Sequence, residues 1–313
     1  MVINELSSEE ISSKLLGILL IDRTTGENIV WGTNDYYEYG CFAVEEIQLD
    51  KVDLIRPRYE KIRQRQKTRT RDRAEIFTPS WLCNEQNNLV DEAWFGRAEV
   101  FNVVVDNWKH TWQTTKDKIV FSGELTWQSY VEANRLEITC GEAPYLVSRY
   151  NATTGEQIEI LQRVGLLDRK LRVVFENAAD EYECLAWMKR AVQSVYGYEF
   201  QGDSLFLARK NVLLSIVEYF TQKFSAKPPE DFLLEIAEII SWNLWQMDGL
   251  TNAIPYANIN HQGSLEGFGK PVNLDEKIYC RIKDWTTGDE LEYRDLLKGA
   301  YRGNCSRKVS STN

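Results

Sequence analysis

Three short apolar segments of this chain each end in a residue that could hold part of a nucleotide. Gly141, Glu199 and Asp248 stand at or directly after the ends of these segments. A glycine allows a tight turn and close backbone approach to a ligand, and an acid at the end of a strand can accept hydrogen bonds from a ribose diol. Asp248 could contact the edge of an adenine ring. Taken singly, each is more often a structural turn or a solvated carboxylate.

The segments that must position these residues alternate between strand-like and helix-like patterns. Apolar residues recur at helical spacing in some segments and form short, strand-sized runs in others. We expect helices at 80–95, 164–176, 183–195, 204–224 and 232–240, and strands at 136–139, 195–199, 242–250 (with a turn) and 278–283, while 278–285 and 291–297 close the chain. This alternation favours an α/β domain with a mostly parallel, twisted sheet and helices on both faces. Ligands of such sheets bind at the carboxyl ends of the strands.

The N-terminal residues are expected to form a small β-containing extension. Residues 15–22 and 29–32 have the pattern of two strands joined by a turn. Residues 96–133 are rich in Trp and Thr and are expected to form an irregular insertion, and the Ser-rich end is expected to be disordered. The expected division is an extension at 1–60, an α/β domain at 61–300 and a tail at 301–313.

The net charge of −10 argues at first against a nucleic-acid partner. Residues 56–73, however, hold nine Lys and Arg against Glu60 and Asp72, a local charge of +7 that leaves −17 on the remainder. A basic stripe can neutralise phosphates locally, because charges are screened beyond about 10 Å. The candidate nucleic-acid-binding residues are Arg63, Arg65, Lys67, Arg69, Arg71 and Arg73. Their alternation would put the charges on one side of an extended arm but spread them around a helix, and a solvated surface segment is the equal alternative.

The composition otherwise indicates an ordinary globular protein of a reducing compartment. The six cysteines form no C-x-x-C pair, and with two histidines there is no zinc-ligand spacing. The longest apolar run is strand-sized and far from the roughly 20 residues that a membrane helix needs. We expect a cytoplasmic protein without a metal and without a membrane partner.

Four segments, in this order, resemble motifs of the adenine methyltransferase region in type I and type IIG restriction–modification proteins. The segments are 75–79, 136–145, 196–199 and 243–250. The first is similar to the E-x-F-T-P segment that covers the methionine moiety of S-adenosylmethionine (SAM), and the second to the SAM-binding loop D-P-A-C-G-x-G-x-F. The third is similar to the segment whose acid holds the ribose, and the fourth to N-x-x-x-x-D-x-L, whose Asp approaches the adenine.

This resemblance implies a class I SAM-methyltransferase-like fold, SAM as cofactor and DNA as partner. It also implies cofactor-binding residues at the matching positions, which are Phe77, Thr78, Pro79, Glu137, Thr139, Cys140, Gly141, Glu199 and Asp248. The chain departs from the family pattern at Glu137, where the family has Asp, and at Thr139, which replaces a small residue. Glu142 and Pro144 alter the glycine-rich turn.

The catalytic motif of the family, N-P-P-Y or D-P-P-Y, is missing. No Asn-Pro or Asp-Pro pair occurs in the sequence, and Pro228-Pro229 follows Lys227 and precedes Asp248, in the wrong order. The expected place for the motif is after a strand downstream of Asp248, where Asp284 could accept from an amino group and Trp285 could stack on a flipped base. A strand that ends in a turn at 286–289 and leads into a hairpin strand is the interpretation that we favour.

Three hypotheses follow. The first is a SAM-dependent DNA adenine-N6 methyltransferase, or the methyltransferase subunit of a restriction–modification or defence system, with Asp284 and Trp285 at the target base. The second is a catalytically degenerate SAM- or DNA-binding subunit of such a system, which the missing motif favours. The third is a methyltransferase that acts on something other than DNA, which the acidic body leaves open.

Overall fold

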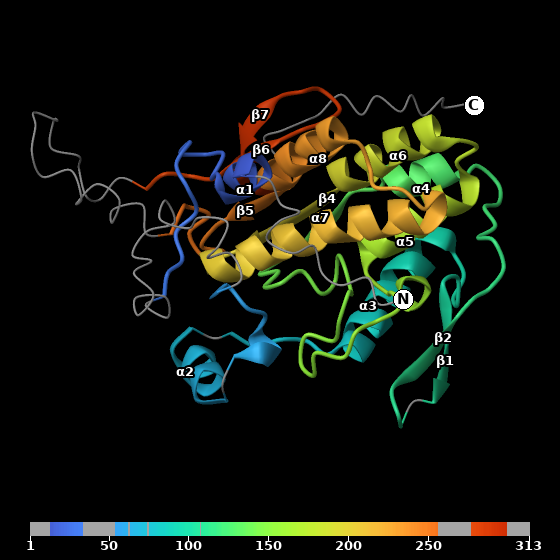
Figure 1. Cartoon of the computed structure of the whole chain (residues 1–313), viewed down its shortest axis with the longest axis horizontal. Helices are drawn as coiled ribbons and strands as arrows, with labels where there is room; N and C mark the ends of the chain where they lie inside the picture. The colour runs from blue at the N-terminus through green and yellow to red at the C-terminus, as the bar shows by residue number, and fades with distance from the viewer. Residues whose placement is uncertain are drawn as a thin grey trace, which may run out of the picture.

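The computed structural model describes residues 13–33, 54–61, 63–73, 75–106, 108–255 and 277–298. The helices are α1 (Ser13–Leu20), α2 (Arg63–Arg73), α3 (Ser80–Phe95), α4 (Trp127–Glu132), α5 (Leu166–Asn177), α6 (Glu181–Gln193), α7 (Gly202–Phe224), α8 (Glu230–Asn243) and α9 (Tyr293–Leu297), with 3-10 turns η4 (Arg58–Glu60) and η5 (Ile160–Gln162). The strands are β1 (Asn102–Asp106), β2 (Thr111–Thr114), β3 (Arg135–Glu137), β4 (Val195–Glu199), β5 (Leu244–Gln246), β6 (Arg281–Lys283) and β7 (Glu290–Glu292). Figure 1 shows their arrangement.

A small parallel sheet in the order β3–β4–β5 lies at the centre of the molecule. Leu136 pairs with Tyr196, and Tyr198 pairs with Trp245. The α/β class and the parallel pairing are confirmed, but the expected full sheet is wrong for the described residues. The last two strands form an antiparallel hairpin instead of joining the sheet, because a short turn connects them where a parallel pair would need a crossover of a dozen or more residues.

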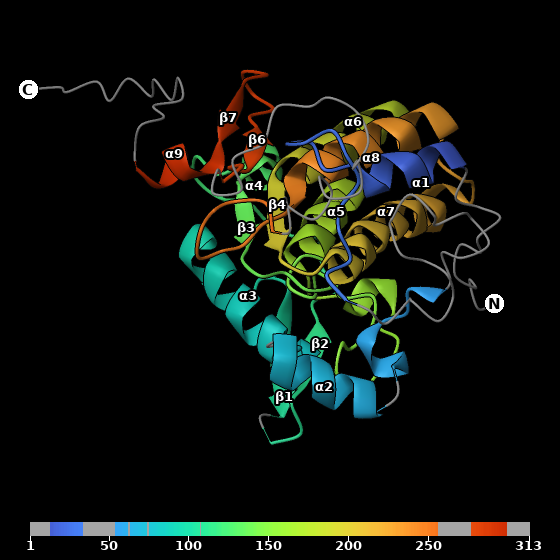
Figure 2. The same cartoon turned by 90° about the vertical axis from the view of Figure 1, so that its left-hand side faces the viewer.

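The two faces of the sheet are covered differently, and the expectation of helices on both faces holds only in part, because one of the faces has a hairpin and the short helix α9. On one face, Val195 and Leu244 belong to the main hydrophobic core with side chains of α5, α6, α7 and α8. On the other face, Tyr198 and Trp245 pack with Ile282 and Tyr293, from the β6–β7 hairpin and α9. Figure 2 shows α5, α7 and α8 on one side of β4, and β6, β7 and α9 on the other.

The described part of the N-terminal extension begins with a helix, not with the expected strand. In α1, four leucines at helical spacing are buried: Leu15, Leu16, Leu19 and Leu20. They pack in the main core, where α1 contacts α7 and α8. A short apolar run fits a buried strand or a buried helix equally well, so its periodicity could not decide between them. The turn after it is confirmed, since the Gly26 amide donates to the carbonyl of Asp22.

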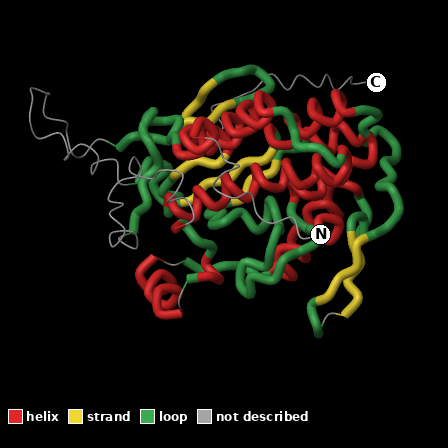
Figure 3. Tube along the Cα trace, in the orientation of Figure 1, coloured by secondary structure: helices red, strands yellow, loops and turns green. Residues whose placement is uncertain are grey.

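The expected irregular insertion contains regular structure. β1 and β2 form an antiparallel hairpin that projects from the body of the molecule (Figure 3). A capping box begins α4, in which Thr126 and Ser129 exchange side-chain and backbone hydrogen bonds. The five helices predicted from 80 to 240 are confirmed to within a few residues. The expected tail at 301–313 lies outside the described residues.

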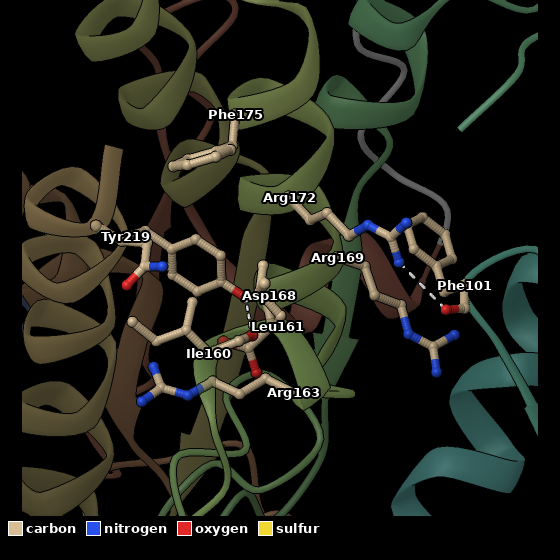
Figure 4. Close-up of a pocket in the computed structure, with 10 residues that line it drawn as sticks. Phe101, Ile160, Leu161, Arg163, Asp168, Arg169, Arg172, Phe175 and Tyr219 are labelled. Carbon is tan, nitrogen blue, oxygen red and sulfur yellow. Dashed lines mark hydrogen bonds between the residues drawn. The ribbon is translucent and has the colours of Figure 1, made fainter. Parts of the chain in front are cut away.

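A cavity of about 20 Å³ lies between α5 and α7 (Figure 4). It has room for about one water molecule. Around it, Arg172 donates to the carbonyl of Phe101 and Tyr219 donates to the carbonyl of Ile160, while Oδ1 of Asp168 and Nε of Arg169 have no hydrogen-bond partner among the described residues. Because of its small volume, this cavity is a gap in packing with room for a water molecule and not for a larger ligand. In the described ranges, every helix is too short or too polar to cross a bilayer.

Candidate functional site

The three strands of the parallel sheet end side by side and bring three predicted residues to one edge. The Cys140 amide donates to the carbonyl of Tyr198 at 2.8 Å, and the Met247 amide donates to the carbonyl of Glu199 at 3.0 Å. The loops that follow β3, β4 and β5 therefore leave the sheet at the same place. We call Phe77, Gly141, Glu199 and Asp248 the carboxyl-edge site.

Gly141 is the centre of this site. Its φ of +55° lies in the left-handed region, which glycine adopts without the penalty that a Cβ imposes. Its amide donates to Oε2 of Glu199 at 2.8 Å. The ring of Phe77 packs directly against it, since a Cβ at Gly141 would lie 3.4 Å from the ring. The guanidinium of Arg58 lies 5.2 Å from the centre of the same ring, so the ring is held between a glycine and a cation.

Glu199 is buried at the end of β4. Its Oε1 accepts from the Gln201 amide at 3.0 Å, and its Oε2 accepts from Gly141. Burial raises the pKa of this carboxyl above its ordinary value. A carboxylate has about four lone-pair sites, and because the backbone of Phe200 also donates to Glu199, one site remains for a further donor such as a ribose hydroxyl.

Close to Glu199 in the chain, two buried polar atoms have no hydrogen-bond partner among the described residues. They are Oε1 of Gln201 and Oγ of Ser204. Gln201 precedes the first residue of α7, and Ser204 lies in its first turn. Since buried polar groups are almost always paired with protein or with an ordered molecule, this edge of the sheet has the chemistry for a polar ligand.

Asp248 begins a turn after β5. Its Oδ1 accepts from the Leu250 amide at 2.9 Å and its Oδ2 accepts from the hydroxyl of Thr251 at 2.9 Å. The Asp248 amide donates to the carbonyl of Ala253. This carboxylate is thus held in place by its own turn, and it is only partly buried, so it can still accept from a ligand.

Two of the predicted cofactor residues face the interior. Both oxygens of Glu137 accept backbone amides, from Tyr145 at 3.2 Å and from Leu146 at 3.1 Å, and burial raises its pKa to about 8. Cys140 is buried against Gly197 in the core. Glu137 and Cys140 therefore shape the loop from inside, and no contact with a ligand follows from their positions.

The remaining predicted cofactor residues, Thr139, Thr78 and Pro79, lie in the segments that lead to Gly141 and away from Phe77. Thr139 is exposed, with a φ of +46°, where the chain turns toward Gly141. Pro79 is the N-cap residue of α3, and the carbonyl of Thr78 accepts from the Cys83 thiol. The segment 77–79 therefore leads the chain from the Phe77 ring directly into α3.

Glu142 is a residue that the sequence analysis treated only as a departure from a motif. Its Oε1 accepts from the Arg58 amide at 2.7 Å, and its Oε2 accepts from the hydroxyl of Tyr150 at 2.5 Å. Burial raises its pKa to about 7. Glu142 thus joins the Gly141 loop to the segment before α2. No local pattern in the sequence could have shown this, because Arg58 and Glu142 are 84 positions apart.

The basic segment is the helix α2, so its charges are spread around an axis instead of lining one side. The assignment of Arg69 to nucleic acid is wrong, because Arg69 is buried. It forms ion pairs with Asp203 at 2.9 Å and with Glu75. Lys61 also pairs with Asp203, at 3.3 Å. Arg69 and Lys61 therefore dock the basic segment against the start of α7.

The outward side of α2 keeps cationic side chains. Lys67 and Arg71 are exposed, and they line a shallow hollow of about 390 Å³ together with Arg58, Gln66 and Thr70. The side chains of Arg63, Arg65 and Arg73 lie outside the described residues. In the described ranges, the cationic surface of α2 therefore consists of Lys67 and Arg71, not of the whole predicted stripe.

Asp284 and Trp285 lie at the opposite end of the sheet. The indole of Trp285 donates to Oδ1 of Asn243 at 2.7 Å, and Asn243 donates to the carbonyl of Val195, the first residue of β4. Asp284 caps the hairpin turn, accepting from the Thr286 amide at 2.8 Å. The structure therefore does not bring Asp284 and Trp285 to the carboxyl-edge site, and the interpretation as a hairpin turn is confirmed.

Among the residues that the structure describes, no three His, Cys, Asp or Glu side chains gather in a way that could hold a metal ion. The carboxyl-edge site offers instead two carboxylates, main-chain amides and one aromatic ring. These groups suit a ligand with hydroxyl donors and a flat ring. Comparisons with protein-family models, with curated proteins and with solved structures gave no match for this chain.

Proposed function

We propose that this chain is the SAM-binding subunit of a methyltransferase assembly of the DNA adenine type, and that it does not transfer methyl groups by itself. The observation that carries the proposal is the meeting of Gly141, Glu199 and Asp248 at one edge of three adjacent parallel strands, with Phe77 packed on the glycine. Ligands of open α/β sheets bind at this edge. The order of the four resembling segments is the second support.

The residues of the site fit an adenosyl ligand in their chemistry. Glu199 has a lone-pair site for a hydroxyl of a ribose beside its bonds from Gly141, Gln201 and Phe200, and Asp248 can accept from the amino group of an adenine. The unpaired Oε1 of Gln201 and the hydroxyl of Ser204 add polar groups next to Glu199. SAM, when bound, supplies an activated methyl group. The chain itself binds and orients this ligand, and the Phe77 ring must move from Gly141 to admit it.

Two observations support the proposal that the chain has no methyl-transfer centre of its own. The N-P-P-Y type motif is absent from the sequence. The substitute residues, Asp284 and Trp285, lie at the amino ends of the strands and are held there by Asn243 and Thr286. A target base stacked on Trp285 would thus be at the wrong end of the sheet for a methyl group bound near Gly141. Lys67 and Arg71 on α2 are the proposed phosphate contacts of the subunit.

Calorimetric titration with SAM tests this proposal with two matched variants. Asp248→Asn and Asp284→Asn each replace the acid of a similar turn, at opposite ends of the sheet. We expect the wild-type chain to bind SAM saturably. Loss of the charge-assisted hydrogen bond from the adenine amino group should weaken SAM binding about tenfold or more in Asp248→Asn, and Asp284→Asn should bind like the wild type.

Two results would contradict the proposal. Absence of SAM binding to the folded wild-type chain at millimolar SAM concentration would exclude SAM as the ligand of this chain. Equal weakening in both variants would show that the ligand does not sit at the carboxyl edge. Circular dichroism of each variant checks that the fold is intact.

A further inference from the structure

One face of the parallel sheet is only half covered. The β6–β7 hairpin and α9 pack over Tyr198 and Trp245 but leave the neighbouring pair, Leu136 and Tyr196, partly open. Leu136 is 45% exposed although it lies in a strand of the central sheet. Parallel sheets are ordinarily buried on both faces. The uncovered half is therefore unusual, and residues of β6, β7 and α9 lie beside it.

The open half of the face forms a groove with an apolar floor. Its volume is about 1150 Å³. The apolar residues that line it come from the sheet, the hairpin and α9: Leu136, Tyr196, Trp245, Ile282, Leu291 and Leu296. Small-molecule pockets typically measure about 300–1000 Å³, so this groove has the size for a polypeptide segment. A helix is the element that ordinarily covers a parallel sheet.

The rim of the groove has cations that lack carboxylate partners. Nε and Nη2 of Arg135 are buried, and no acceptor among the described residues bonds to them. Lys283 forms no ion pair within the described ranges, and its ammonium lies 5.6 Å from the ring centre of Trp242 and 5.0 Å from that of Trp285. Nη1 of Arg135 donates to the carbonyl of Asn134 at 3.1 Å, and its guanidinium carbon lies 6.0 Å from the ring centre of Tyr130. The two other nitrogens are buried without an acceptor, which is costly. These cations therefore favour a ligand that brings negative charge to the rim of the groove.

The other charged groups of the rim do not pair with Arg135 or Lys283. Arg190 already pairs with Glu132, at 3.0 Å. Asp284 accepts from the Thr286 amide in the hairpin turn. The two acids that line the groove are thus engaged elsewhere, while Arg135 and Lys283 have no anionic partner within the described part of the chain.

We propose that this groove binds an amphipathic helix of a partner polypeptide. The helix presents an apolar stripe to Leu136 and Tyr196 and carries carboxylates that meet Arg135 and Lys283. This inference rests on the open face and the unpaired cations, and it stands whether or not the chain binds SAM, because the groove lies at the opposite end of the sheet from Gly141.

Selection from a phage-displayed library of 16-residue helices provides the test. The library is selected on the wild-type chain, with removal of phage that also bind Leu136→Asp. We expect binders with an apolar i, i+3, i+4, i+7 stripe flanked by Asp and Glu. A synthetic peptide of the selected sequence should lose at least about tenfold in affinity for Arg135→Glu, a loss of at least 1.4 kcal/mol. Lys189→Glu, on the exposed side of α6, is the matched control and should bind normally.

Three outcomes would overturn the proposal. Recovery of no binder that discriminates against Leu136→Asp would show that the groove takes no helix. Recovery of basic sequences, or equal affinity for wild type and Arg135→Glu, would contradict the predicted charge. Self-association of the wild-type chain that Leu136→Asp abolishes, measured by sedimentation, would assign the groove to a second copy instead. The folded state of Leu136→Asp and Arg135→Glu is checked by circular dichroism and by thermal unfolding.

Discussion

At the scale of single residues, burial separates side chains that look equivalent in the sequence. Lys67, Arg69 and Arg71 alternate in an identical pattern, yet Arg69 points inward to Asp203 while the other two are exposed. Alternate residues of a helix point about 200° apart on the axis, and the sequence does not give the phase of that rotation. A buried arginine requires carboxylate partners, and Asp203 lies 134 positions away.

Burial also changes the ionisation of two acids near the carboxyl-edge site, Glu137 and Glu142. Glu137, with a pKa of about 8 in the folded chain, has an ordinary value of 4.5. Between these values the folded chain holds a proton that the unfolded chain has released. Its contribution to stability is therefore fully present below pH 4.5 and is lost as the pH rises through about 8. Glu142, with a pKa of about 7, acts in the same direction.

We predict that Glu137→Gln flattens the pH dependence of stability. The free energy of unfolding, measured with urea from pH 5 to 8, should fall less steeply with pH in the variant, by up to about 1.4 kcal/mol per pH unit. The difference should be clearest between about pH 5.5 and 7, where Glu137 is ionised in the unfolded chain and protonated in the folded chain. The variant should also be less stable overall, since an amide nitrogen cannot accept the Leu146 amide.

Glu124→Gln is the control for this prediction. Glu124 is exposed in the segment before α4, so its replacement should leave the slope unchanged. An identical slope for wild type and Glu137→Gln would show that Glu137 is ionised in the folded chain, and that burial is offset by its two backbone hydrogen bonds.

At the scale of elements, the sequence predicted those whose pattern is long. α7 and α8 are confirmed because their apolar periodicity continues over several turns, and β4 because a short apolar run ends at Glu199. The strand predicted at 15–22 was wrong, because the eight residues of α1 are too few to distinguish a helix from a strand by their pattern. The pairing of β6 with β7 depends on the turn at Asp284, which was recognised, but its place on the sheet depends on contacts with Trp245 that no local pattern contains.

The junction between the N-terminal segment and α7 gives an element-scale prediction. A Cβ at Gly202 would lie 2.2 Å from the carbonyl oxygen of Val30, so the two segments can only meet at a glycine. Gly202→Ala should therefore lower the free energy of unfolding by about 1–3 kcal/mol. Gly17→Ala, in α1, meets nothing within 4 Å and should raise it by about 0.5–1 kcal/mol, because alanine favours helix. Urea denaturation compares both.

These two variants also test how α1 is attached. If Gly202→Ala has no effect on stability, the contact between Val30 and α7 is absent in solution. If Gly17→Ala is destabilising, α1 is not helical there. Either result would contradict the packing of the N-terminal segment on α7 and α8.

At the scale of the whole molecule, the two candidate sites, the polar carboxyl-edge site and the apolar groove, lie at opposite ends of one small sheet. The carboxyl ends of the strands carry Gly141, Glu199 and Asp248, with α2 and its exposed cations docked beside them through Asp203. The amino ends carry the open groove and Trp285. In the described residues, no strand pairs with the outer edge of β3. Within the described ranges, the parallel sheet therefore has no fourth strand whose loop could join the carboxyl-edge site.

This division predicts that the purified chain alone transfers no methyl group to DNA. With isotopically labelled SAM and unmethylated duplex DNA, incorporation should equal that of a reaction without protein, although SAM binds. The reason is geometric, because Asp284 and Trp285, the groups predicted for the target base, are fixed at the amino ends of the strands by Asn243 and Thr286. Transfer by the chain alone, lost in Asp284→Asn, would contradict this and would establish a free-standing enzyme. Transfer that appears only when a groove-binding partner is added would connect the two ends of the sheet in one assembly.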